Sequence, residues 1–324
     1  MQLTTAKAKP FLKWAGGKAQ LINQITARLP EELRSGKIRR YVEPFVGGGA
    51  LFFHIAHTFD IDELFISDVN EELILAYTTI KKDVNGLIDA LKVMERKYFR
   101  LSPSRQEEYF YTIRFQLNEQ RPDFSFRRFH PTWVNRAAQI IFLNKTCFNG
   151  LFRVNSKGEF NVPFGKYKNP TICAEENLRE VSELLQRAEI RLGDFTECEQ
   201  FVDDESFVYF DPPYRPISKT ASFTSYSKYE FDDAAQLRLA SFYRLLHKKN
   251  ARLMLSNSDP KNENPNDHFF ENKKGIKGVP PPKERTGSGC FGVRFAPVLH
   301  FVAHYPSIAL RIPNAKPLPL KKAA

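Results

Sequence analysis

The chain has 324 residues, of which 42% are hydrophobic and 26% are charged, and its formal net charge is +11. A chain of this length can bury a full hydrophobic core and exceeds one average domain, so we expect a catalytic domain with a second domain inserted into it. The apolar runs are only strand-sized and the stretch MQLTTAKAKP lacks a hydrophobic segment, which argues against a membrane protein and predicts a cytoplasmic location.

In chain order, apolar runs that end in polar or glycine-rich turns alternate with helical stretches. Asn70, ahead of Glu71 and Glu72, is a typical helix N-cap. The alternation predicts an α/β fold with a doubly wound, mainly parallel sheet, interrupted at about residues 81–175 by an inserted domain. The predicted strands are residues 41–45, 63–67, 189–192, 207–210 and 252–255, and the predicted helices are residues 18–29, 70–98 and 232–248.

The positive charge is unevenly distributed along the chain. Residues 273–324 carry +9 of the net +11, so residues 1–272 are nearly neutral. Within this body, Arg127, Arg128 and Arg136 alternate with aromatic side chains and offer a basic cleft for nucleic acid. A solvated helix face would explain the same pattern.

The spacing of the cysteines bears on whether they form disulfides or bind a metal. Cys147, Cys173, Cys198 and Cys290 show neither a C-x-x-C spacing nor a disulfide framework. We therefore expect reduced structural thiols and no metal site, with metal binding as the weaker alternative.

The most informative motif is Asp211-Pro212-Pro213-Tyr214, directly behind the apolar run 207–210. The prolines lack backbone N–H groups and fix φ, so the carbonyls of Asp211 and Pro212 stay available as acceptors. Acceptors beside an aromatic face suit a flat ring with an exocyclic amino group, such as adenine. A proline-stiffened turn is the structural alternative, but it requires neither the acid nor the tyrosine.

A second motif is the glycine turn Gly47-Gly48-Gly49, which follows the strand 41–45. Glycines let the backbone approach a ligand that a Cβ atom would repel. The spacing differs from the dinucleotide fingerprint G-x-G-x-x-G. Asp68 nevertheless ends the next strand, where its carboxylate is suited to ribose hydroxyls.

Four motifs in one order carry a family resemblance: FLKWAGGK from Phe11, EPFVGGGALFF from Glu43, NGLFRVN from Asn149 and DPPY from Asp211. Over about residues 10 to 271 the chain resembles the Dam-type (D12 class) DNA adenine-N6 methyltransferases. It is most similar to restriction-associated members that methylate GATC, because the segment from Lys145 to Pro170 resembles their recognition segment. The resemblance implies a methyltransferase-type sheet that binds S-adenosyl-L-methionine, with an inserted, mostly helical target-recognition domain.

The resemblance also implies the domain limits and the partners. Residues 1–80 and 176–271 would form the catalytic domain, and residues 81–175 the target-recognition domain. Double-stranded DNA would be the substrate, and a restriction endonuclease the functional partner. We expect a monomer.

The resemblance assigns roles to individual residues. Asp211 and the Pro212 carbonyl would accept hydrogens from adenine N6, with Pro213 fixing the turn and Tyr214 stacking on the flipped base. Arg153 would present its fork to a guanine, and Phe148 would wedge into the base stack. The implied cofactor-binding residues are Trp14, Lys18, Phe45, Gly47, Gly49, Asp68, Asp194 and Phe195. The implied DNA-binding residues are Lys13, Phe148, Asn149, Leu151, Arg153 and Asn155.

Each of these assignments has a structural alternative. The glycines would simply make a turn, and the WAGGK stretch would be packing. Phe148 and Leu151 would belong to the core, Lys13 would be a surface lysine, and Arg153 would be a member of a surface ion pair.

The composition changes behind Phe270. Eight prolines lie between Pro280 and Pro319, with almost no helical periodicity. The closing strands of the family are not recognisable, and only the runs 298–305 and 308–312 are substitutes for them. We therefore expect an atypical, basic, proline-rich tail over residues 272–324 that stays outside the sheet, produced by a shifted reading frame or by divergence.

Two other functions remain open. Cytosine-N4 or protein-glutamine methyltransferases use related tetrads, although these more often begin with Ser or Asn. An inactive or impaired relic that binds DNA through its basic tail is the second, because loss of the closing strands would leave an unpaired sheet edge.

Overall fold

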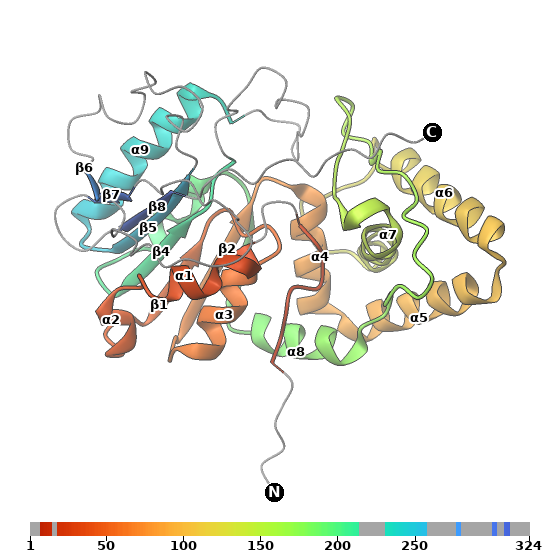
Figure 1. Cartoon of the computed structure of the whole chain (residues 1–324), viewed down its shortest axis with the longest axis horizontal. Helices are drawn as coiled ribbons and strands as arrows, with labels where there is room; N and C mark the ends of the chain where they lie inside the picture. The colour runs from red at the N-terminus through yellow and green to blue at the C-terminus, as the bar shows by residue number, and fades with distance from the viewer. Residues whose placement is uncertain are drawn as a thin grey trace, which may run out of the picture.

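The structure is a computed structural model, which describes residues 7–14, 18–213, 231–257, 277–279, 300–302 and 308–311. Tyr214, Cys290 and most of the tail lie outside the described residues. Figure 1 shows a sheet flanked by helices and, beyond α4, a second group of helices that contains α5, α6 and α7.

A six-stranded sheet forms the centre, in the order β3-β2-β1-β4-β5-β8, and every neighbouring pair of strands is parallel. The order reverses between β1 and β4, which is the switch point where open α/β sheets bind ligands. The prediction of an α/β fold with a mainly parallel sheet is confirmed, and all five predicted strands form. The strands are β1 (Arg40–Glu43), β2 (Glu63–Asp68), β3 (Ala188–Leu192), β4 (Ser206–Phe210), β5 (Arg252–Asn257) and β8 (Ile308–Arg311).

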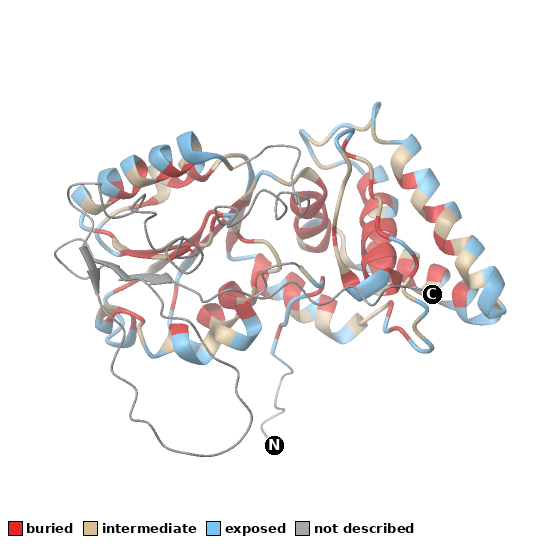
Figure 2. Ribbon diagram, turned by 45° about the horizontal axis from the view of Figure 1, so that its top comes forward, coloured by how far each residue is buried: buried red, intermediate tan, exposed pale blue. Residues whose placement is uncertain are grey.

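Side chains alternate along the strands and fill a separate core on each face of the sheet. Tyr41 and Phe207 belong to the larger core with α3 and α4, whereas Val42 and Val208 belong to the smaller core with η3 and α9. Figure 2 shows the strands as buried and the outer turns of the covering helices as exposed. Burial on both faces is expected of parallel strands and explains their continuous apolar sequences.

Two of the predicted helices differ from the structure. The predicted helix 18–29 forms as η1 (Lys18–Leu21) followed by α1 (Ile22–Thr26), and it ends three residues early. Asn70 caps α4 as predicted, because its side chain accepts a hydrogen bond from the Leu73 amide. The predicted helix 70–98 is divided at Asp83, whose side chain accepts from the Gly86 amide and starts α5. The helices are η1 (Lys18–Leu21), α1 (Ile22–Thr26), α2 (Glu31–Arg34), α3 (Ala50–Thr58), α4 (Glu71–Lys82), α5 (Val84–Arg100), α6 (Pro103–Glu119), α7 (Thr132–Thr146), η2 (Phe148–Gly150), α8 (Glu175–Leu185), η3 (Phe195–Phe201) and α9 (Asp233–Lys248).

A buried ion pair joins α4 to α7, which lies against α4, α5 and α6. The Arg136 guanidinium, 1% exposed, binds both carboxylate oxygens of Glu72 and lies over the ring of Phe124. The suggestion that Arg136 contributes to a basic cleft is therefore wrong, because its charge is already neutralised inside the protein. Arg127 and Arg128 are exposed.

Part of the tail joins the sheet. β8 pairs in parallel with β5, and β6 (Lys277–Val279) pairs with β7 (His300–Val302) in an antiparallel ribbon. The expectation that the chain from about residue 273 stays outside the sheet is therefore wrong for Ile308–Arg311. A short extended run is enough, because its backbone can pair with the N–H and C=O groups that the edge of β5 would otherwise leave unpaired.

Candidate active site

Asp211 lies at the switch point, directly behind β4. Its carboxylate Oδ2 is 2.6 Å from the Lys18 ammonium, and these side chains are 17% and 8% exposed. Gln236 of α9 donates to the Pro213 carbonyl at 3.3 Å, and Asn257 at the end of β5 donates to Gln236 at 3.1 Å. The structure therefore brings Lys18, of the first motif, to the Asp-Pro-Pro turn and supports that turn from α9 and β5.

Glu43, at the end of β1, is a buried acid that the sequence analysis did not single out. It is 3% exposed, and the Tyr41 hydroxyl donates to its Oε2 at 2.7 Å. Burial raises the pKa of Glu43 to about 8; the Tyr41 hydrogen bond opposes this rise, and the Asp211 carboxylate adds to it. The available signal was an acid within the predicted strand 41–45, four residues before the first glycine of the turn.

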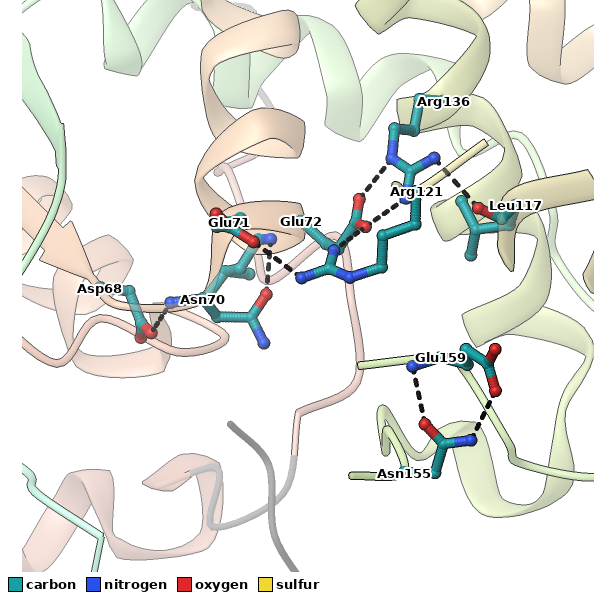
Figure 3. A network of polar contacts seen from close by, with 10 residues as sticks. Asp68, Asn70, Glu71, Glu72, Leu117, Arg121, Arg136, Asn155 and Glu159 are labelled. Carbon is teal, nitrogen blue, oxygen red and sulfur yellow. Dashed lines mark hydrogen bonds and ion pairs between the residues drawn. The ribbon is translucent and has the colours of Figure 1, made fainter. Parts of the chain in front are cut away.

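Asp68 and the glycine turn are joined by hydrogen bonds. The Asp68 carboxylate accepts from the Gly47 amide at 3.1 Å and from the Asn70 amide at 2.9 Å, the second of which is visible in Figure 3. Burial raises the pKa of Asp68 to about 6, although these backbone donors lower it. Tyr77 donates to the Gly47 carbonyl at 3.2 Å, so α4 also holds the turn.

The glycines of the turn are required by their backbone conformations and neighbours. Gly47 has φ +47°, and a Cβ there would lie 2.9 Å from Cδ1 of Trp14. Gly49 has φ +69°, and a Cβ there would lie 2.5 Å from the Tyr77 hydroxyl. Trp14 in turn stacks on Phe152 with the ring centroids 5.0 Å apart. The tryptophan therefore links the turn to the segment that contains the predicted DNA contacts.

The other predicted cofactor residues gather on the opposite side of the sheet end. Phe45 stacks with Phe195 at 5.6 Å and meets Phe231 edge-on at 5.7 Å. Arg238 of α9 binds Asp194 with two hydrogen bonds of 2.9 and 2.8 Å and lies over the Phe195 ring. Nothing in the sequence marked Arg238, because an arginine on a helix carries no sign of its distant partner.

Asn144 of α7 joins the first motif to the third. Its side chain accepts from the Lys13 amide at 2.9 Å and donates to the carbonyls of Lys13 and Gly150, both at 2.9 Å. The Lys13 side chain is exposed, and its ammonium lies 5.6 Å from the centre of the Tyr167 ring. The backbone of Lys13 is therefore fixed while its charge remains accessible.

The predicted DNA-binding residues around η2 differ in exposure. Phe148 is 48% exposed, which rules out its alternative role as a core residue. Asn149 is exposed with φ +56°, and Leu151 is partly buried against the large core. An exposed phenylalanine on a constrained turn is suited to insertion between bases.

Arg153 and Asn155 lie on one strand of a short hairpin. Arg153 Nε donates to Asn161 Oδ1 at 2.8 Å, and Asn155 donates to the Glu159 carboxylate at 2.7 Å. The partners of both residues are therefore within the hairpin itself, and Figure 3 shows the pair of Asn155 and Glu159. Arg153 is not in an ion pair among the described residues.

Other kinds of site find no support in the part of the chain that the structure describes. The histidines, cysteines and acids there form no cluster able to hold a metal ion. Cys147, Cys173 and Cys198 are free thiols. Among the described helices, none is both long and apolar enough to cross a membrane.

The chain belongs to the D12 class N6 adenine-specific DNA methyltransferases, because the model of that family matches residues 14–279. It is a DNA adenine-N6 methyltransferase whose methyl donor is S-adenosyl-L-methionine, which confirms the resemblance seen in the motifs.

Three individual proteins are similar to the chain over most of its length. The chain is 52% identical over 252 residues to the type II methyltransferase M.MjaIII of Methanocaldococcus jannaschii, a match that covers 78% of this chain and 85% of the relative. It is 39% identical over 260 residues to the type II methyltransferase M1.LlaDCHI of Lactococcus lactis subsp. cremoris, covering 80% and 84%. It is 34% identical over 253 residues to the DNA adenine methylase of Escherichia coli, covering 78% and 82%.

Proposed function

We propose that the chain methylates adenine in double-stranded GATC sites, inside the cell, as the monomeric methyltransferase of a restriction–modification pair. The type II methyltransferases among its relatives support this context. The likeness of residues 145–170 to the recognition segment of GATC-methylating enzymes supports the site. A cognate endonuclease that cleaves the same sequence would be the functional partner.

The observation that carries the proposed chemistry is the position of Asp211 at the sheet switch point, paired with Lys18 at 2.6 Å. Adenine N6 is a poor nucleophile because its lone pair is delocalised into the ring. Hydrogen bonds from the amino group to the Asp211 carboxylate and the Pro212 carbonyl would localise that lone pair. Lys18 would orient the carboxylate, and Tyr214 would stack on the base.

The donor site would be formed by the predicted cofactor residues on both sides of this turn. When bound, S-adenosyl-L-methionine supplies a methyl group on an activated sulfonium. The turn at Gly47 and Gly49 would admit it closely, Asp68 would accept from its ribose hydroxyls, and Phe45 would face its apolar parts. The remaining candidates, Trp14, Lys18, Asp194 and Phe195, surround the same end of the sheet.

The target base must leave the duplex before it can reach Asp211. Extruding a base costs a few kcal/mol, which stacking and hydrogen bonds in the pocket would offset. The exposed Phe148, beside Asn149 and Leu151, would fill the vacated space, while Arg153, Asn155 and Lys13 would contact the flanking bases and backbone.

The test is methylation of duplexes that contain one GATC site or the same site changed at one position, followed by analysis of the modified base. We expect N6-methyladenine at GATC alone. Methylation mapped to another sequence would refute GATC as the recognition sequence. Detection of N4-methylcytosine would refute adenine as the methyl acceptor. Absence of turnover would favour the inactive relic. Sedimentation of the protein alone tests the monomer.

A further inference from the structure

The segment that carries Arg153 and Asn155 is a small antiparallel hairpin, residues 153–162, which we call the recognition hairpin. The Asn161 amide donates to the Arg153 carbonyl at 3.2 Å, and the Asn155 amide donates to the Glu159 carbonyl at 2.9 Å. Gly158 closes the turn with φ +81°. A two-stranded hairpin of this size is marginally stable in water, so its conformation depends on what it is packed against.

The C-terminal part of α6 holds the backbone of this hairpin. The Asn118 side chain donates to the Phe160 carbonyl at 3.1 Å and accepts from the Phe160 amide at 2.8 Å. One planar amide therefore satisfies both backbone groups of a residue, as a neighbouring strand would. One turn earlier, Arg114 donates to the Val162 carbonyl at 3.3 Å.

Arg121, three residues beyond Asn118, supports the turn. A Cβ atom on Gly158 would lie 2.9 Å from Arg121 Nε, so the guanidinium is packed against the bare backbone of the turn. Arg121 is itself anchored to the first turn of α4, where it binds Glu71 and Glu72, each at 2.7 Å. Figure 3 shows this anchor beside the hairpin pair of Asn155 and Glu159.

These contacts determine the register of the hairpin. Phe160 and Val162, whose backbones are held from α6, are 3% and 1% exposed. Their neighbour Asn161 alternates with them and holds the Arg153 guanidinium through Nε. Side chains alternate across a strand, so a slip of the pairing by one residue would move Phe160 and Val162 out of the core. It would also turn Asn161 away from Arg153.

We propose that Asn118 and Arg121 are positioning residues for DNA sequence recognition, which clamp the backbone of the recognition hairpin and so fix the direction of Arg153. The inference rests on the proposed function, because Arg153 is the proposed guanine contact. Neither residue needs to touch DNA, because each acts through the hairpin.

Two substitutions test the clamp from different contacts. Asn118→Asp keeps the acceptor for the Phe160 amide but replaces the donor by a second oxygen facing the Phe160 carbonyl. Arg121→Gln removes the support of the turn and leaves Glu72 paired with Arg136, so no buried acid is orphaned. Gln116→Ala, an exposed position on the same helix, is the matched control.

The readout is the ratio of kcat/KM on the methylated site found by mapping to kcat/KM on duplexes changed at one guanine of that site. Partial unfolding lowers both rate constants equally and leaves the ratio unchanged, so the ratio reports positioning and not stability. We expect each clamp variant to lower it at least about fivefold, which is the lower end of what one good base contact contributes. The affinity of Asn118→Asp for S-adenosylhomocysteine should be unchanged.

Arg153→Ala, alone and combined with each clamp variant, separates the two hypotheses. If the clamp acts through Arg153, the ratio falls in Arg153→Ala and falls no further in the double variants. A ratio that falls in Arg153→Ala but stays at the wild-type value in both clamp variants overturns the clamp alone. An unchanged ratio in Arg153→Ala overturns the guanine contact and the route through Arg153. If Asn118→Asp fails to fold, Arg121→Gln decides.

Discussion

Lys18 and Asp211 form an ion pair of 2.6 Å between the first residue of η1 and the residue that follows β4. Both side chains are largely buried, so solvent screens their interaction less than it would at the surface. The pair brings the first sequence motif to the acceptor turn and holds the proposed catalytic carboxylate in one orientation.

Asp211→Ala should abolish methyl transfer and leave cofactor binding largely intact, because the carboxylate acts on the target amine. Single-turnover methylation and binding of S-adenosylhomocysteine measure the two effects. Asp204→Ala, at an exposed position just before β4, is the control. If Asp211→Ala kept more than about a tenth of the wild-type rate, a loss below about 1.4 kcal/mol, the assignment would be wrong.

Glu43→Gln should make the protein more stable at mildly alkaline pH. The pKa of Glu43 rises from 4.5 to about 8 on folding, so between these values the folded state binds more protons than the unfolded state. Stability therefore falls as pH rises through this window, and glutamine removes that fall. We expect a gain on the order of 4 kcal/mol near the upper end.

Thermal unfolding of Glu43→Gln over this pH range checks the prediction. Glu205→Gln changes an exposed acid beside β4 and should reproduce the wild-type profile. A Glu43→Gln variant whose stability has the wild-type dependence on pH would show that Glu43 ionises normally in the folded protein.

Cofactor affinity should fall as the pH drops through about 6. Burial raises the pKa of Asp68 to about 6, and the ionised form is the better acceptor for ribose hydroxyls. The Kd for S-adenosylhomocysteine should therefore rise on acidification, as isothermal titration calorimetry can measure. Asp68→Asn should bind more weakly near neutral pH and lose this pH dependence. An identical profile in the variant would exclude Asp68 as the titrating group.

Gly49→Ala should weaken cofactor binding and destabilise the fold more than Gly36→Ala does. The two glycines have φ values of +69° and +72°, so the backbone strain of an alanine is matched. A Cβ on Gly49 would lie 2.5 Å from the Tyr77 hydroxyl, whereas one on Gly36 would meet nothing within 4 Å. The difference between the two unfolding free energies therefore measures the steric conflict.

Tyr77→Phe removes the hydroxyl that an alanine at Gly49 would meet. In that background, Gly49→Ala should cost less than in the wild type, because the nearest atom is gone. Equal costs in both backgrounds, measured by chemical denaturation, would exclude the Tyr77 hydroxyl as the cause of the requirement for glycine.

Local sequence determined the secondary structure and the motifs that carry the chemistry. The apolar run 207–210 and the prolines behind it predicted a strand end with free acceptors, and Asn70 predicted the start of α4. These features depend on residues that are adjacent in the sequence. A strand buried on both faces is a continuous apolar run, proline constrains its own backbone, and an N-cap side chain binds an amide two or three residues further on. Each motif is also a run of adjacent residues, so the motifs and their order could indicate the family from the sequence.

Only the tertiary structure decided which distant groups meet. Arg136 looked like a nucleic-acid contact in sequence but neutralises the buried Glu72, and Arg238 reaches Asp194 from another helix. The pKa of Glu43 is raised because β1 is buried in the sheet. Asn118 binds the Phe160 backbone because α6 packs beside the recognition hairpin. Ion pairs, burial and backbone clamps join residues that are far apart in the chain, and the direction in which a side chain points depends on packing that no local pattern records.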